Sequence, residues 1–264
     1  MKKILQLVVF MTFCLGVKAQ ILVIPDVHGR TFWKEAVSMY PDMHVIFLGD
    51  YLDPYGGENI SEKDALVNFQ EILDFKKSNM ERVTLLIGNH ELHYLDMDLE
   101  FSRKDTINAP RIHDMLYENI ILFRLATSAQ CSGKTFLFSH AGILQTWWKK
   151  HFPNVASNAD DVCNALNDKI ISDESTITTF INEALMNISE IRGGEDETGS
   201  CLWADINEHN GKNGFPTDVY QVFGHSQLRK NAKIKKGYAD LDCRQAFIIT
   251  TDGKFLVAKK EVNK

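Results

Sequence analysis

The amino-acid sequence predicts an α/β fold, a sandwich of two β-sheets with helices outside, from two patterns. Short aliphatic runs without polar alternation recur at 21–24, 45–48 and 83–87, and such runs are typical of strands that are buried on both faces. Helical segments separate these runs, and a strand–helix–strand order produces right-handed crossovers and parallel strands. The first part of the chain is therefore expected to form a largely parallel sheet.

Local signals place the other elements along the chain. Pro41 ends the first helical segment, and Ser61-Glu62-Lys63-Asp64 resembles a capping box at the start of the second. Helices are expected at 31–40, 61–77, 142–151, 160–171 and 175–190. Further strands are expected at 121–125, 135–139, 220–223, 237–242, 246–250 and 255–258. The polar, glycine-rich stretch 192–200 is expected to be a mobile surface loop.

Length and composition suit one domain. The chain has 264 residues, of which 44% are apolar, and a net charge of −6. This acidic balance, without a block of Lys or Arg, argues against nucleic-acid binding as the main role. Residues of metal-binding types run from position 26 to position 225. A site assembled from both ends of the chain indicates a single catalytic domain over residues 20–264.

The N-terminus has the pattern of an export signal. Met1-Lys2-Lys3 precedes a mostly apolar run, and Val17-Lys18-Ala19 resembles a cleavage site. We therefore expect residues 1–19 to be the signal peptide of a periplasmic or secreted protein; the alternative is a first buried strand or helix. Cleavage would remove three lysines and no acidic residue, which changes the net charge from −6 to −9. The run is shorter than the roughly 20 residues of a membrane span, so no stable membrane anchor is expected.

The cysteines do not indicate a metal site. Cleavage would leave four of them, and none forms a Cys-x-x-Cys pair: Cys131, Cys163, Cys201 and Cys243. Export would permit one or two disulfides, whose pairing the sequence leaves open. The oligomeric state is open as well.

Polar residues of metal-binding types follow five of the expected strands. They are Asp26 with His28, Asp50, Asn89 with His90, His140, and His225. Open α/β sheets bind ligands at the carboxyl ends of their strands, and Asp, Asn and His bind hard to borderline divalent metals. Two adjacent metal ions need a shared anionic ligand, and Asp50 follows the central of the first three strands. Such a pair lowers the pKa of a bridging water and stabilises an in-line displacement at phosphorus.

Five sequence blocks at these strand ends resemble the signature blocks of the calcineurin-like metallophosphoesterases. In the family's order they are Asp26-x-His28-Gly29, Gly49-Asp50-x-x-Asp53, Gly88-Asn89-His90-Glu91, Ser139-His140-Ala141-Gly142 and Gly224-His225. The second and third blocks are most similar to the serine/threonine protein phosphatase branch, including its bacterial Shewanella-type members. The resemblance covers residues 26–226. It implies a four-layer α/β/β/α sandwich with two mixed β-sheets, and a phosphoric ester hydrolase with two divalent ions of Mn, Fe or Zn.

The resemblance also implies roles for individual residues. One metal would be held by Asp26, His28 and Asp50, and the other by Asp50, Asn89, His140 and His225. His90 would be the general acid that protonates the leaving oxygen, oriented by Asp53, because a carboxylate raises the pKa of an imidazole and fixes its orientation. Gln227 stands where many relatives outside this branch carry a second histidine.

Other residues near the blocks are expected to be structural. Glu91 should support its loop through hydrogen bonds rather than bind metal. Trp147 and Trp148 are expected in the core. Five histidines outside the blocks are expected at the surface or the edge of the core: His44, His93, His113, His151 and His209.

Two departures concern the arginines that bind substrate phosphate in this branch. The branch continues the Gly-Asp-x-x-Asp block with arginine, where this chain has Pro54. The block 202–205 resembles a substrate loop in which Shewanella-type relatives often carry an arginine, and here that residue is Asp205. Another cation would have to bind the phosphate. Arg30 and Arg192 are the expected substrate-binding residues, with Arg103 and Arg111 as further candidates by location and surface solubility as the alternative role.

Together, these patterns predict a metal-dependent phosphoesterase that hydrolyses phosphomonoesters, either a phosphoprotein or a small phosphorylated molecule. Water activated between the metals would attack phosphorus while His90 protonates the leaving group. A phosphodiesterase or a dinucleoside polyphosphate hydrolase, with the same metal core, is an alternative. A catalytically degenerate, metal-dependent module that binds a phosphorylated ligand is another. The Asp53–His90 pair favours catalysis, because a binding module needs no general acid.

Overall fold

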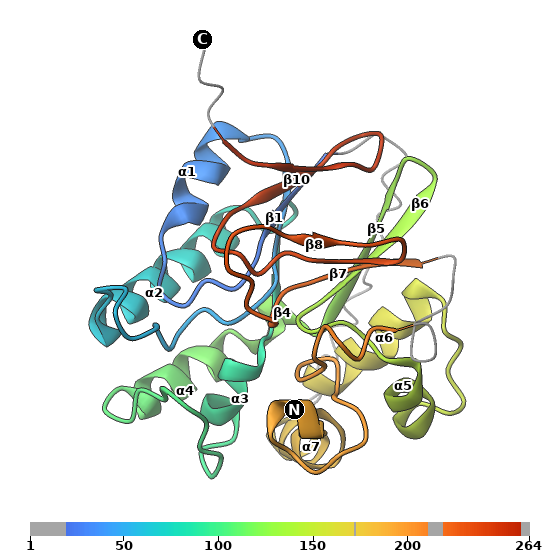
Figure 1. Cartoon of the computed structure of the whole chain (residues 1–264). Helices are drawn as coiled ribbons and strands as arrows, with labels where there is room; N and C mark the ends of the chain where they lie inside the picture. The colour runs from blue at the N-terminus through green and yellow to red at the C-terminus, as the bar shows by residue number, and fades with distance from the viewer. Residues whose placement is uncertain (1–19, 172, 211–218, 260–264) are drawn as a thin grey trace, which may run out of the picture.

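The computed structural model describes residues 20–171, 173–210 and 219–259. Two mixed β-sheets pack face to face, and helices cover the outer face of each sheet (Figure 1). The predicted four-layer α/β/β/α sandwich is thus confirmed. The predicted signal peptide, residues 1–19, lies outside the described residues.

The first sheet has six strands in the order β11-β10-β1-β2-β3-β4. Their bounds are β1 Ile21–Ile24, β2 His44–Phe47, β3 Val83–Leu86, β4 Phe123–Arg124, β10 Phe247–Ile249 and β11 Phe255–Val257. Strands β1 to β4 are parallel, as the strand–helix–strand order predicts, and β10 and β11 join antiparallel beside β1. The carboxyl ends of β1, β2 and β3 therefore lie side by side at one edge.

The second sheet has five strands in the order β5-β6-β7-β9-β8. Their bounds are β5 Ala126–Cys131, β6 Lys134–Ser139, β7 Val219–Phe223, β8 Lys233–Ile234 and β9 Tyr238–Asp240. Strand β5, which the sequence analysis did not predict, forms a hairpin with β6 through a turn at Ser132 and Gly133, both with positive φ. Strands β6, β7 and β9 are parallel, so their carboxyl ends also share an edge.

Seven helices and three shorter turns are found in the described part of the chain. The helices are α1 Phe32–Met39, α2 Glu62–Ser78, α3 Asn89–Leu95, α4 Ala109–Glu118, α5 Gln145–His151, α6 Ala159–Ile170 and α7 Glu174–Phe180. The turns are Ile120–Leu122 and Glu190–Arg192, both 3-10, and the π-helical Ile181–Leu185. The predicted cap of α2 is present, since Ser61 Oγ accepts a hydrogen bond from the backbone N–H of Asp64 at 3.1 Å. None of these helices has the length and apolar character needed to cross a membrane.

Alternate strand residues enter two different hydrophobic clusters. In β1, Leu22 and Ile24 pack in the larger cluster with the helices, and Ile21 and Val23 pack in the cluster between the two sheets. Successive side chains of a strand point to opposite faces. Burial of both faces explains why the strand runs show no polar alternation.

The structure also bears on the two tryptophans, the cysteines and the glycine-rich stretch 192–200. Trp147 and Trp148 are buried in the core, as expected. The four described cysteines are buried and free. The expectation of a surface loop at 192–200 is wrong for its last residues, because Ser200 is fully buried and its Oγ donates to the backbone oxygen of Leu185 at 2.7 Å.

His209 is a buried histidine rather than the surface or core-edge residue that we expected. Its Nε2 donates to the backbone oxygen of Ala141 at 3.0 Å, and its ring stacks on Phe223. Burial lowers the pKa of His209 to about 4, so the imidazole is neutral in the folded protein at neutral pH. A histidine in the unfolded chain has a pKa of about 6.5. Between these two pKa values, the unfolded state therefore binds more protons than the folded state. The contribution of His209 to the free energy of unfolding is complete above the pKa of the unfolded state, and it is lost as the pH falls toward the pKa of the folded state.

Replacement of His209 by glutamine should reduce the loss of stability in acid. Between about pH 7.5 and about pH 5, His209 should account for about 2 kcal/mol of the decrease in the free energy of unfolding. Glutamine offers an amide donor for Ala141 and does not titrate, so His209→Gln should lack this part of the decrease. Urea unfolding of both proteins at both pH values measures the difference. The same pH dependence in both would contradict the prediction.

Candidate metal centre

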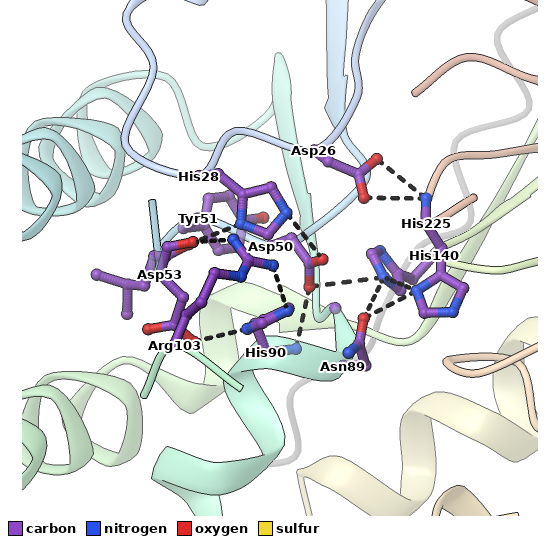
Figure 2. A network of polar contacts seen from close by, with 12 residues as sticks. Asp26, His28, Asp50, Tyr51, Asp53, Asn89, His90, Arg103, His140 and His225 are labelled. Atoms are coloured by element: carbon purple, nitrogen blue, oxygen red, sulfur yellow. Dashed lines mark hydrogen bonds and ion pairs between the residues drawn. The ribbon is translucent and has the colours of Figure 1, made fainter. Parts of the chain in front are cut away.

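The polar residues that follow five strands converge on one place at the carboxyl ends of these strands, with contributions from both sheets (Figure 2). The first sheet contributes the residues after β1, β2 and β3, and the second contributes those after β6 and β7. The side chains brought together are Asp26, His28, Asp50, Asn89, His90, His140 and His225, with Asp53 beside them. All eight are buried.

Left-handed backbone turns these side chains inward. His28, Asp50, Asp53 and His225 have φ angles of 44°, 51°, 58° and 65°. For residues other than glycine such angles cost roughly 1–3 kcal/mol each and persist where the surroundings enforce them, typically at functional sites. The chain therefore turns sharply at the strand ends, against its local preference.

Glu91 holds two of these strand ends together. One carboxylate oxygen accepts hydrogen bonds from the backbone N–H groups of Gly88 at 2.8 Å and Asp50 at 2.9 Å, and the other accepts from Tyr51 at 2.9 Å. Both oxygens of Glu91 are thus used by the backbone. This is the supporting role expected for Glu91.

Asp50 lies between two groups of histidines. Its Oδ2 is 3.4 Å from Nε2 of His28, and its Oδ1 is 3.5 Å from Nε2 of His140. Oδ1 also accepts a hydrogen bond from the backbone N–H of His90 at 3.0 Å. One oxygen therefore faces each group, which is the placement that a ligand shared by two cations needs.

Three ligand-type atoms meet on the His140 side of Asp50. Oδ1 of Asn89 is 2.9 Å from both Nε2 of His140 and Nδ1 of His225, and the two nitrogens are 3.2 Å apart. Nδ1 of His140 faces the backbone oxygen of Leu48 at 2.8 Å, so Nδ1 carries the proton and Nε2 presents a lone pair. That lone pair points at oxygens of Asn89 and Asp50, which are acceptors too. A cation bound between them would satisfy all of these atoms.

The same reasoning applies on the His28 side. Nδ1 of His28 donates to the backbone oxygen of Leu52 at 2.8 Å, which leaves the lone pair of Nε2 facing Asp50. The two oxygens of Asp26 accept from the backbone N–H of His225 at 2.9 and 3.1 Å. Gly224 permits this approach, because a Cβ there would lie 1.9 Å from Oδ2 of Asp26.

The protonation equilibria of the three histidines suit metal ligands. Burial lowers the pKa of His28, His140 and His225, which keeps these imidazoles in the neutral form that binds metals. Burial and the charge of Asp50 raise the pKa of Asp26 to about 8. Burial alone would raise the pKa of Asp50 too, but His140 and the other histidines lower it well below its usual value.

The donor set therefore fits divalent cations. Within each of two groups, His28–Asp50–His90 and Asp50–His140–His225, the ligand atoms lie within 4.8 Å of one another, and Asp50 belongs to both. The donors are carboxylate and amide oxygens and imidazole nitrogens, which suit Mn, Fe or Zn.

Asp53 anchors a second cluster beside the metal-type residues. Its Oδ2 accepts from Nδ1 of His90 at 2.7 Å and lies 2.8 Å from Nε2 of His93, while Oδ1 accepts from the hydroxyl of Tyr94. Burial would raise the pKa of Asp53, but the contacts with His90 and His93 lower it. The expectation that His93 lies at the surface or core edge is wrong, because it is fully buried here. Its spacing of three residues from His90, which places both on one face of α3, was the signal in the sequence.

A cavity of about 530 Å³ opens onto the candidate centre. Asp50, Asn89, His90 and His225 of the candidate centre line it. The other lining residues are Tyr55, Glu100, Phe101, Ser102, Arg103, Ile188, Arg192, Gly193 and Trp203. Phe101 and Trp203 pack edge to face, with ring centroids 4.9 Å apart. The lining of the cavity thus combines polar residues of the candidate centre with aromatic residues.

The four candidate arginines lie in different places. Arg192 lines the cavity, with its Nε 3.0 Å from Oδ2 of Asp205. Arg30 is outside the set of lining residues, and its guanidinium binds Glu58 through two hydrogen bonds of 2.7 and 3.0 Å. Arg111 is exposed on α4, and Arg103 lines the cavity. The substrate-binding role of Arg30 and Arg192 stays a prediction.

Comparisons with known proteins agree with this geometry. A family model described as calcineurin-like phosphoesterase matches residues 19–227. Among solved structures, the chain is similar to a protein serine/threonine phosphatase from Saccharomyces cerevisiae with similarity to human phosphatase PP5. The TM-score is 0.51, with 14% identity, and the match covers 89% of this chain and 74% of that chain. At this identity the similarity shows the fold alone. No curated protein matches the sequence.

Proposed function

Since the chain belongs to the calcineurin-like phosphoesterase family, whose members are metal-dependent hydrolases, we propose that it hydrolyses phosphomonoesters. Phosphoproteins or small phosphorylated molecules are the proposed substrates. One observation carries this proposal: Asp50 faces a histidine group with each oxygen, and a His90–Asp53 pair stands next to it. A carboxylate placed to bind two metal ions supports displacement at phosphorus, and an oriented imidazole beside it can protonate the leaving group.

The proposed ligand sets follow the two sides of Asp50. The first is Asp26, His28 and Asp50, and the second is Asp50, Asn89, His140 and His225. When bound, the two divalent ions would lower the pKa of a water molecule and neutralise charge that develops on the phosphoryl group. The protein's own contribution is to keep the imidazoles neutral by burial and to fix each one through its other ring nitrogen or its backbone.

His90 is the proposed proton donor. Nδ1 of His90 donates to Asp53, so Nε2 is the nitrogen that faces the cavity and can carry the proton to the leaving oxygen. Asp53 lies 2.7 Å away and stabilises the imidazolium before transfer. The contacts of Asp53 with His93 and Tyr94 hold the carboxylate in place, so its orientation does not depend on His90 alone.

We also propose that the protein is exported. Residues 1–19 have the charge and apolar pattern of a signal peptide. The family match begins at residue 19 and strand β1 begins at Ile21, so the proposed signal precedes the catalytic fold.

Turnover of p-nitrophenyl phosphate tests the proposed function. The purified protein should release p-nitrophenol with Mn²⁺, Fe²⁺ or Zn²⁺, lose this activity after chelation, and regain it when metal is returned. Metal content measured by atomic emission accompanies each assay. Absence of turnover with two metals bound would overturn the phosphomonoesterase proposal. Cleavage of bis(p-nitrophenyl) phosphate would then indicate a phosphodiesterase, and phosphate binding without cleavage would indicate a binding module.

A further inference from the structure

Two arginines line the cavity, and one of them, Arg103, has no role in the proposed function as stated so far. Pro54 occupies the position where the resemblance leads one to expect a phosphate-binding arginine. We propose that Arg103, delivered from a different loop, binds the substrate phosphate in its place. This inference rests on the proposed function of the same site and names the residue that positions its substrate.

The location of Arg103 is the first argument. Its Nη2 lies 2.9 Å from Nε2 of His90, and its Nη1 donates to the backbone oxygen of Asp53 (Figure 2). The guanidinium therefore stands beside the nitrogen that is proposed to protonate the leaving group. A substrate whose leaving oxygen can receive a proton from His90 Nε2 also has its phosphoryl group within reach of Arg103.

Charge is the second argument. Arg30 and Arg192 both lie within ion-pair distance of a carboxylate, from Glu58 and Asp205 respectively. For Arg103, the described part of the chain offers no carboxylate within that distance. Its positive charge is thus left for a ligand. Guanidinium is weakly hydrated and presents paired N–H donors that match two phosphate oxygens.

Tyr55 is the platform that holds Arg103. The Cζ of Arg103 is 3.8 Å from the centre of the Tyr55 ring, a cation–π contact. Burial raises the pKa of Tyr55 to about 12, so the ring stays a neutral phenol at ordinary pH. This contact holds the guanidinium against the ring beside the cavity, which both residues line. Because Tyr55 directly follows Pro54, the loop without its own arginine supplies the surface on which another arginine rests.

The backbone around Arg103 is also held. Arg103 has a φ of 69°, an angle that is unfavourable for a residue with a Cβ. The side-chain Nζ of the next residue, Lys104, donates to the backbone oxygen of Leu99 at 2.7 Å, and the backbone N–H of Asp105 donates to the hydroxyl of Tyr94 at 2.8 Å. Tyr94 also contacts Asp53. The loop that carries Arg103 is therefore attached to the cluster that orients His90.

A bound phosphate would change the partner of Arg103. In this structure Nη2 donates to Nε2 of His90. A phosphate oxygen is the stronger acceptor because it is charged, so Nη2 would donate to it instead. His90 Nε2, which accepts from Nη2 in this structure and so carries no proton there, would then be free to bind a proton from solvent and to give it to the leaving oxygen. Phosphate binding and exposure of the proton donor are thus linked through one guanidinium.

Binding of inorganic phosphate to the metal-loaded protein tests this proposal. Calorimetry should show phosphate bound about 10- to 100-fold more weakly by Arg103→Ala than by the wild-type protein, with unchanged metal content. Arg103→Lys keeps the charge and most of the bulk but loses the paired donors, so its affinity should lie between the two. If Arg103→Ala fails to fold, Arg103→Lys decides. A lower phosphate affinity of this variant would show that the paired N–H donors of the guanidinium, and not the positive charge alone, bind the phosphate.

Arg111→Ala is the matched control. It removes the same charge from an exposed position on α4 and should bind phosphate as the wild-type protein does. If Arg103→Ala lowers turnover but leaves phosphate affinity unchanged, Arg103 acts only by supporting His90 and Asp53, and the proposal is overturned. If the wild-type protein hydrolyses no phosphomonoester, the proposed function fails, and phosphate affinity still decides the role of Arg103.

Discussion

His90→Asn should lower kcat by about 10²- to 10⁴-fold with phenyl phosphate or phosphoserine, the range that a general acid contributes. The loss should be much smaller with p-nitrophenyl phosphate, because p-nitrophenolate leaves without protonation. Asparagine cannot supply a proton from the position of Nε2. The side chain of His90 is not in either proposed ligand set, so two metals per protein should still be found. Steady-state rates with both substrate types and the metal content are the measurements.

The outcome for metal content separates two roles of His90. His90 lies in one group with His28 and Asp50, so it could instead be a ligand. Loss of metal from His90→Asn would show that it is, and the role of proton donor would be wrong. An equal loss of kcat for good and poor leaving groups would also contradict general-acid catalysis. His151→Asn, at the end of α5 and outside the cavity lining, is the control that should change neither quantity.

Gly224→Ala should weaken metal binding by about 10- to 100-fold, although glycine and alanine differ by one methyl group. A Cβ at this position would lie 1.9 Å from Oδ2 and 3.0 Å from Cγ of Asp26. The carboxylate must move, and it then loses its hydrogen bonds from the backbone N–H of His225. Competition with a chelating dye measures the affinity, and turnover at limiting metal should fall in parallel.

One outcome would contradict the prediction for Gly224→Ala, and one variant serves as its control. Unchanged metal affinity in Gly224→Ala would remove Asp26 from the proposed ligands. Gly237→Ala is the control, because a Cβ there meets nothing within 4 Å and should leave metal affinity and turnover at the wild-type values.

The arrangement of the centre was largely predictable because it depends on strand order. Parallel neighbouring strands bring their carboxyl ends together whatever the details of packing, so Asp50 and Asn89 had to lie near Asp26. The support from Glu91 was predictable for a similar reason, since it is only three residues from Gly88. In both cases short spacings or regular elements determine the contact.

Contacts between irregular segments were not predictable in this way. Arg30 is next to the first sequence block, yet its guanidinium pairs with Glu58, 28 residues away. Arg103 reaches Asp53 across 50 residues from a loop without helical or strand periodicity. Strand β5, with the small and polar sequence Ala126–Cys131, is a strand because it pairs with β6, not because of its own propensity. Side-chain partners in loops depend on packing that no local pattern encodes.

The left-handed backbone of the centre limits how stable this protein can be while it remains active. His28, Asp50, Asp53, Arg103 and His225 all have positive φ. At roughly 1 kcal/mol or more each, they together hold a sizeable part of the 5–15 kcal/mol that usually separates a folded protein from its unfolded state. Glycine at any of them would relax the chain and remove the functional group. Selection for heat resistance alone would therefore replace residues of the site before residues of the sheets. A more thermostable variant that kept its activity would have to gain its stability from contacts outside the site.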